Sequence, residues 1–180
     1  SLSKNEVHLT LSRKLPSSPA LPITLVMALV KKDTFETIVR QATELGVSRI
    51  IPVQAARSEK KNLNFERISA IAREAAEQSG RGTLPSIDEV RSVEGALELL
   101  TCPSIVGSLH GTQDALNVVQ AQPCALWVGP EGGWTDEEES LFRERGFIFF
   151  TCSSTVLKAD TAASALLANL VARFPLQKGL

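Results

Sequence analysis

A glycine-rich turn that contains an acid, GPEGG at residues 129–133, stands between an apolar run and an acid-rich segment. Glycine lets a backbone pass close to another molecule, and the carboxyl ends of strands are where open parallel sheets bind ligands. The spacing is not that of a phosphate-binding loop, and the acids at 136–139 would repel a phosphate. The turn therefore predicts a site for a ligand without a phosphate, and a tight turn that binds nothing is the alternative.

A second segment, Cys152–Leu170, has the same layout. Small residues follow a predicted strand, and Lys158 and Asp160 flank the start of a helix that is apolar on nearly every side. A lysine can stabilise negative charge that develops during a reaction, whereas a surface lysine and a plain N-cap aspartate are the alternatives. The helix, expected at Ala162–Arg173, is either buried or half of a subunit interface, and we expect it in the interface of a homodimer.

Composition sets the limits of these interpretations. A chain of 180 residues that is 43% apolar and 22% charged has the size of one ordinary domain. Its longest apolar run, 23–30, is far shorter than the roughly 20 residues of a membrane span, and we expect a cytoplasmic protein without a membrane partner. Three scattered cysteines and two histidines predict neither disulfides nor a metal site. The net charge of −1 leaves one basic stretch, Arg57–Arg81, as a candidate RNA contact or an ordinary mixed-charge surface.

Apolar periodicity predicts strands that alternate with helices. This alternation favours an α/β fold with a mostly parallel sheet and helices on both faces. Asp33 is expected to cap the first helix and Gly46 to end it, and Thr135–Glu138 has the pattern of a capping box. Strands are expected at 23–29, 49–53, 104–109, 124–128 and 147–152, and helices at 33–45, 65–78, 93–100, 112–120, after 135, and at 162–173.

Residues 1–22 do not fit this alternation. The run Val7–Leu11 has the period of a strand without a partner, so we expect 1–22 to be the remnant of a preceding domain and its linker, and 23–180 to be one domain.

Four segments in order, at 42–53, 73–85, 129–138 and 156–167, resemble the ribosomal RNA small-subunit methyltransferase E family of the SPOUT superfamily. They read ATELGVSRIIPV, REAAEQSGRGTLP, GPEGGWTDEE and VLKADTAASALL. The resemblance implies a SPOUT-like α/β fold with a C-terminal trefoil knot, a homodimer, and S-adenosyl-L-methionine as the methyl donor. It also implies methylation of a uridine N3 in 16S rRNA of the small ribosomal subunit, and an N-terminal barrel domain of which little is present here.

The proposed reaction and the resemblance together assign residues. The chemistry of methyl transfer predicts that Lys158 stabilises an anionic uridine ring, while Asp160 orients Lys158 or caps the helix. The resemblance implies that Gln78 and Arg81 face the RNA. No general base is evident. The cofactor pocket would be lined by Leu109, His110, Gly129, Pro130, Glu131, Gly132, Gly133, Cys152, Ser153, Val156 and Leu157.

The sequence departs from the family pattern in one loop. Ser153, Thr155, Lys158 and Asp160 stand where the family has glycine, arginine, arginine and glutamate. Lysine does not reproduce the planar arginine fork, and aspartate is one methylene shorter than glutamate. The alternative function is therefore a catalytically weakened paralogue that binds cofactor or RNA without efficient turnover. An unrelated small-molecule binder would require four ordered matches by coincidence.

Overall fold

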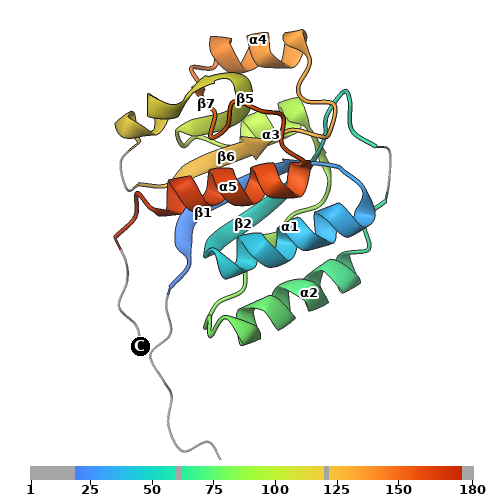
Figure 1. Cartoon of the computed structure of the whole chain (residues 1–180). Helices are drawn as coiled ribbons and strands as arrows, with labels where there is room; N and C mark the ends of the chain where they lie inside the picture. The colour runs from blue at the N-terminus through green and yellow to red at the C-terminus, as the bar shows by residue number, and fades with distance from the viewer. Residues whose placement is uncertain (1–18, 60–61, 120–121, 176–180) are drawn as a thin grey trace, which may run out of the picture.

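A seven-stranded sheet forms the centre of the computed structural model, which describes residues 19–59, 62–119 and 122–175 (Figure 1). The strands are β1 (Leu21–Ala28), β2 (Val47–Gln54), β3 (Ser86–Ile87), β4 (Arg91–Ser92), β5 (Ser104–Thr112), β6 (Cys124–Val128) and β7 (Ile148–Phe150). Their order is β3-β2-β1-β6-β5-β7, and β4 also pairs with β2. Every pairing in this part of the chain is parallel, so the predicted parallel sheet is confirmed.

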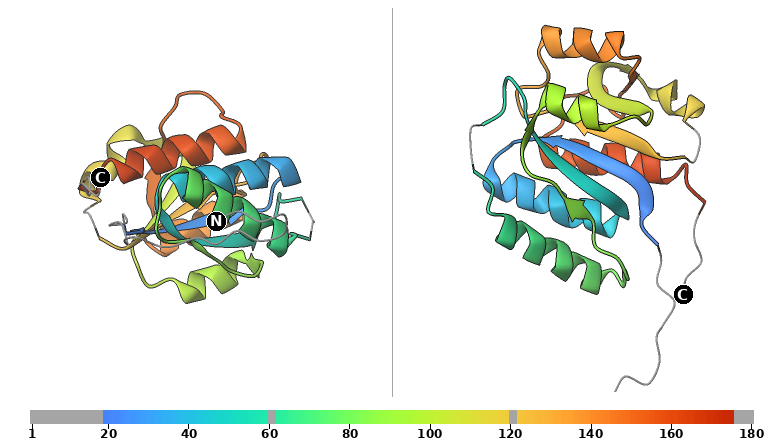
Figure 2. Two further views of the ribbon diagram at one scale, coloured as in Figure 1. Left: turned by 90° about the horizontal axis from the view of Figure 1, so that it is seen from below. Right: turned by 180° about the vertical axis from the view of Figure 1, so that it is seen from behind.

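Helices cover both faces of this sheet, as predicted (Figures 1 and 2). The helices are α1 (Lys32–Glu44), α2 (Phe65–Gln78), α3 (Val93–Leu99), the 3-10 helix η1 (Gln113–Val118), α4 (Asp136–Glu144) and α5 (Ala159–Val171). Residues of α1, α2 and α5 pack in one hydrophobic cluster, and residues of α3 and α4 pack in the other. The sheet therefore separates two cores.

The all-apolar sequence of β6 follows from its place in the middle of the sheet. Leu126 points into the cluster formed with α1, α2 and α5, while Trp127 points into the cluster formed with α3 and α4. The ring of Trp127 lies 5.4 Å from that of Phe142, centroid to centroid. A central parallel strand is buried on both faces, which explains a continuous apolar run without alternation.

The start of α1 differs from the prediction, while its end agrees with it. The helix begins at Lys32 with Lys31 at the N-cap, so the assignment of Asp33 as the cap is wrong. Asp33 lies in the first turn, where its negative charge meets the positive end of the helix dipole. Gly46 ends the helix with φ of 93°, which confirms it as the stop.

Of two further predicted helices, the one after residue 135 is confirmed and the one at 112–120 is not. Thr135 and Glu138 form both hydrogen bonds of a capping box, at 3.2 and 2.8 Å, as expected. The helix expected at 112–120 is instead the end of β5, which extends to Thr112, followed by the 3-10 helix η1.

Helix α5 begins earlier than expected. It starts at Ala159 with Lys158 at the N-cap, so Asp160 is not the cap. Leu166 and Leu170 are buried by the chain itself, which packs α5 on α1 and β6. Their burial agrees with the alternative of a buried helix, and the place of α5 in a homodimer interface stays a prediction.

The N-terminal prediction lies outside the described residues, because the structure describes nothing before residue 19. The sheet starts at Leu21, which pairs with Val47, two residues before the expected start of the domain. Of the helices that the structure describes, none is long and apolar enough to span a membrane.

Strand β5 leaves the regular ladder near its end. Phe150 of β7 pairs with both Gly107 and Thr112, so the residues between these two arch away from the sheet. Gly111 returns the arch to β7 at very close range, since a Cβ on it would lie 2.6 Å from backbone atoms of Phe150. The arch thus depends on a glycine at this position.

We predict that Gly111→Ala lowers the free energy of unfolding by about 1–3 kcal/mol, because the backbone of β7 must move to admit the methyl group. Gly95→Ala is the matched control: its nearest neighbour, Ser92 Oγ, lies 3.4 Å from the added carbon, and alanine suits a helix better than glycine. Urea denaturation measures both variants, and equal stability of the two would contradict this description of the arch.

Candidate functional site

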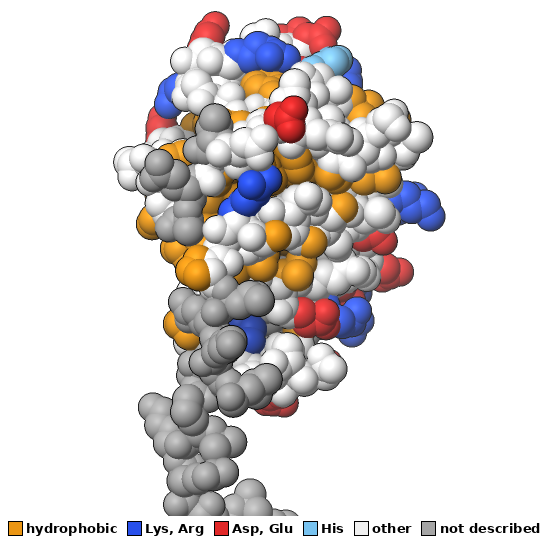
Figure 3. Space-filling model, turned by 60° about the vertical axis from the view of Figure 1, so that its left-hand side comes forward, with side chains coloured by type: hydrophobic (Ala, Val, Ile, Leu, Met, Phe, Trp, Pro, Cys, Tyr) orange, Lys and Arg blue, Asp and Glu red, His pale blue; other side chains and the backbone are white. Residues whose placement is uncertain are grey.

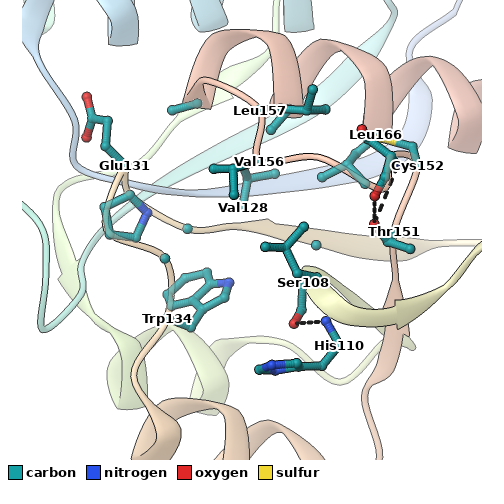
Figure 4. A pocket seen from close by; sticks show the side chains of 18 of the residues that line it. Ser108, His110, Val128, Glu131, Trp134, Thr151, Cys152, Val156, Leu157 and Leu166 are labelled. Carbon is teal, nitrogen blue, oxygen red and sulfur yellow. Dashed lines mark hydrogen bonds between the residues drawn. The ribbon is translucent and has the colours of Figure 1, made fainter.

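One cavity of about 340 Å³ lies where three strands end (Figure 4). Its walls come from the arch of β5, from the glycine turn after β6 and from the loop after β7, residues 151–157. All the residues predicted to bind a cofactor line this cavity: Leu109, His110, Gly129, Pro130, Glu131, Gly132, Gly133, Cys152, Ser153, Val156 and Leu157. Three segments that are distant in sequence therefore form one site, and their binding of a cofactor stays a prediction.

The glycines of the turn serve the turn itself as well as the cavity. Gly133 has φ of 69° and its N–H donates to the carbonyl of Pro130 at 2.8 Å, which closes a tight turn. A Cβ on Gly129 would lie 3.2 Å from the ring of Trp134. A Cβ on Gly132 would lie 3.3 Å from Arg57, so a side chain there would displace that arginine first.

Arg57 holds the glycine turn from the segment after β2. Its Nη1 donates to the carbonyl of Gly132 at 2.9 Å and to that of Trp134 at 3.1 Å. The backbone N–H of Ala56 donates to the carboxylate of Glu138 at 2.8 Å. Sequence reasoning counted Arg57 with a possible RNA surface and missed this role, since no local pattern links positions 75 residues apart.

The loop after β7 is braced by its own hydroxyl groups. Thr151 Oγ1 donates to the carbonyl of Ser153 at 2.8 Å, and the N–H of Thr155 donates to Ser153 Oγ at 3.0 Å. Two of the residues that depart from the family pattern thus stabilise the loop. Val156, in the same loop, is 77% exposed and leaves an apolar side chain at the rim of the cavity.

Lys158 and Asp160 lie next to the cavity and are not among its lining residues. Lys158 is exposed at the N-cap of α5, and the carboxylate of Asp160 accepts from the N–H of Thr161 at 2.9 Å. Within the described residues no ion pair joins the two side chains. Their catalytic roles stay predictions.

A serine and a histidine on the lower wall of the cavity in Figure 4 contact a glutamate that also lines the cavity. Ser108 Oγ donates to Glu139 Oε1 at 2.6 Å, and His110 Nδ1 lies 2.8 Å from Glu139 Oε2. Burial acts to raise the pKa of Glu139, but the hydrogen bonds from Ser108 and His110 and the charges of His110 and Arg143 lower it overall. Ser108 and Glu139 were missed because they meet only through the fold.

Of the three cysteine thiols, that of Cys124 is buried, while those of Cys102 and Cys152 are half-buried. Burial raises the pKa of Cys152, which lines the cavity, and raises that of Cys124 to about 12. In the part of the chain that the structure describes, no group of three or more histidine, cysteine or acidic side chains could hold a metal ion.

The residues predicted to face RNA lie away from the cavity. Gln78 is exposed at the end of α2, while the guanidinium of Arg81 donates to the carbonyls of Thr43 and Val47. Arg67 is paired with Glu36 at 2.5 Å. Much of the basic stretch therefore makes internal contacts, and on the face in Figure 3 lysines and arginines are mixed with acids. RNA binding by Gln78 and Arg81 stays a prediction.

A family model described as RNA methyltransferase domain matches residues 16–171. The chain belongs to this family. It is similar to ribosomal RNA small subunit methyltransferase E of Synechocystis sp., with 37% identity over 161 residues that cover 83% of this chain and 53% of that protein. The same enzyme of Bacillus subtilis is 30% identical over 181 residues, 90% of this chain and 71% of that protein. The predicted methyltransferase E family is thus confirmed, and the chain spans about half the length of the Synechocystis relative.

Solved structures share the fold. Ribosomal RNA small subunit methyltransferase E from Neisseria gonorrhoeae, bound to S-adenosyl methionine, superposes with a TM-score of 0.77 at 28% identity, covering 91% of this chain and 70% of that one. A putative methyltransferase from Legionella pneumophila, in complex with the same cofactor, gives 0.78 at 27% identity, covering 87% and 67%.

We predict that Arg57→Ala speeds amide hydrogen exchange at Gly132–Trp134, because the turn loses both hydrogen bonds to the guanidinium. Hydrogen exchange read by mass spectrometry measures this, with Arg73→Ala on the exposed side of α2 as the control. Equal exchange in the two variants would mean that Arg57 does not hold the turn.

Proposed function

We propose that the chain is the catalytic domain of an S-adenosyl-L-methionine-dependent methyltransferase that acts on N3 of a uridine in 16S rRNA. The observation that carries the proposal is the cavity, in which all the residues predicted to bind the cofactor meet at the carboxyl ends of β5, β6 and β7. The family match and relatives crystallised with S-adenosyl methionine support it. Methylation of uridine N3 rests on the resemblance alone.

The cavity suits the proposed cofactor in shape and chemistry. Val128, Leu157 and Leu166 give it apolar walls that fit an adenine ring, and the carboxylate of Glu131 favours a nearby sulfonium charge. The indole N–H of Trp134 is a buried donor without a partner within the described part of the chain. A buried donor of this kind is stabilised when a bound molecule supplies an acceptor.

The chain's own residues would divide the work. Backbone groups of the glycine turn and of the loop after β7 would hold the cofactor, which supplies an activated methyl group. Lys158, exposed beside the cavity, would stabilise the negative charge on the uridine ring, and Asp160 would orient the side chain of Lys158. The cavity wall around Leu166 and Trp134 would exclude water from the reacting atoms.

The wider architecture belongs to the same proposal. Strand β7 lies at the edge of the sheet, next to β5. The chain then crosses from β7 to α5, which contacts β6 and α1. This crossing supports a C-terminal trefoil knot. A homodimer is proposed from the family, and the apolar side chains of Leu109 and Val156, 57% and 77% exposed, offer surface that a second copy would cover. The resemblance is also the basis on which we propose that residues 1–22 are the remnant of a barrel domain. On the same basis we propose that the protein binds the small ribosomal subunit and is located in the cytoplasm.

The alternative of a weakened paralogue is not favoured by these relatives, and the altered loop keeps its own hydrogen bonds. Methyl transfer decides between the two. Small ribosomal subunits that lack this modification are incubated with the chain and methyl-labelled cofactor, and digested nucleosides are identified by mass spectrometry. We expect N3-methyluridine; label on another nucleoside would contradict the N3 assignment, and cofactor binding without transfer would favour the paralogue.

We predict that Trp134→Phe weakens binding of S-adenosylhomocysteine by about two- to tenfold, because a hydrogen bond of about 0.5–1.5 kcal/mol is lost in the complex. The free protein should lose only the packing of the missing ring atoms, since the indole N–H has no hydrogen-bond partner in the described part of the chain. Trp127→Phe is the matched control: that indole donates to Ser104 at 3.3 Å, away from the cavity, so stability should fall while affinity does not. Calorimetry and thermal unfolding measure both; unchanged affinity of Trp134→Phe would contradict the donor role.

A further inference from the structure

Ser108, Glu139 and His110 form a chain of hydrogen bonds to which the proposed function assigns no role. His110 and Ser108 lie on the arch of β5, while Glu139 comes from the first turn of α4. The backbone N–H of His110 also donates to Ser108 Oγ at 3.1 Å, drawn as a dashed line in Figure 4. Three polar side chains from two elements thus fix one another at the wall of the cavity.

The carboxylate in this cluster is set up to orient the imidazole. The side chain of Glu139 is only 13% exposed, and its two oxygens are divided between Ser108 and His110. An ionised carboxylate beside Nδ1 keeps a proton on that nitrogen, so the lone pair of the neutral ring is on Nε2. His110 is 67% exposed, so Nε2 is open to a substrate at the mouth of the cavity.

Methylation of a ring N–H requires a group that takes the proton. Among the cavity's described lining residues, the candidates with a titratable side chain are Arg57, His110, Glu131, Glu139 and Cys152. Arg57 is cationic, Cys152 is a neutral thiol of raised pKa, and Glu139 is occupied by its two partners. Imidazole is a stronger base than a carboxylate and is the usual general base near neutral pH.

We propose that His110 is the general base of the methyl transfer and that Glu139, held by Ser108, is the positioning residue that orients it. This inference rests on the proposed function. In the step, the N3–H bond of uridine breaks and its proton goes to Nε2 of His110. The N3–CH3 bond forms as the S–CH3 bond breaks, so the sulfonium becomes a neutral thioether and the imidazole becomes an imidazolium.

The charges around the ring favour that outcome. Glu139 and Arg143 on α4 are the charged groups in contact with His110 or with its partner, Arg143 at 3.5 Å from Glu139. Glu131 and Arg57 lie on the glycine-turn wall of the same cavity. Arg143 contacts Oε2 of Glu139, the oxygen that also contacts His110, and its guanidinium stacks over Phe149 at 4.0 Å. The carboxylate therefore stabilises the imidazolium once the proton has moved.

The first test compares binding with turnover. His110→Ala should lower the single-turnover rate of methyl transfer by at least about a hundredfold, the usual contribution of a general base. Its affinity for S-adenosylhomocysteine should fall much less than the rate, because His110 is one of many residues that line the cavity, and added imidazole should restore part of the rate. A rate within a few-fold of the unaltered protein, or a loss of rate matched by an equal loss of affinity, would overturn the proposal.

The second test concerns the positioning role. Glu139→Gln removes the charge beside the imidazole and keeps the shape of the side chain, so the maximal single-turnover rate should fall and the pH dependence of the rate should change. Glu144→Gln, exposed on the same helix, is the control and should leave both unchanged. A lower rate with an unchanged pH dependence would overturn the role of Glu139 in orienting the base.

The two levels of the claim can fail separately. An active protein whose rate does not depend on His110 overturns the general base alone. A protein that binds S-adenosylhomocysteine but methylates no uridine N3 overturns the proposed reaction, and the general base with it.

Discussion

The break in register between β5 and β7 is the constraint on which the rest of the site depends. Phe150 pairs with residues five positions apart on β5, and the intervening arch carries Ser108, Leu109 and His110 out of the sheet and into the cavity. Gly111 returns the arch to β7, and a Cβ at this position would lie 2.6 Å from backbone atoms of Phe150. This wall of the site therefore requires a glycine at 111.

The other two walls depend on contacts from outside their own segments. The glycine turn is closed by its own hydrogen bond, but its place is held by Arg57 from the segment after β2. The loop after β7 is braced by Thr151 and Ser153, and α5 anchors its far end through Leu166 and Leu170. Flexible loop backbone becomes a defined surface because each loop is fixed at two points.

The sequence predicts those parts of this structure that depend on local periodicity. The apolar run of β6, the amphipathic pattern of α2 and the capping box of α4 each have one physical solution, and all three appear as expected. Local rules failed at element boundaries: α1 begins at Lys32, which places Asp33 inside the first turn, and β5 extends into the segment predicted as a helix. The contacts of Arg57 and Glu139 join residues far apart in sequence, and periodicity carries no information about such pairs.

The central claim is that the cavity between the arch, the glycine turn and the loop after β7 holds the methyl donor. A crystal structure of the chain with S-adenosylhomocysteine tests it most directly. The account predicts electron density for the ligand in this cavity, in contact with all three segments and with an acceptor near Trp134 Nε1. Density for the ligand at another place on the surface, with the cavity empty, would contradict it.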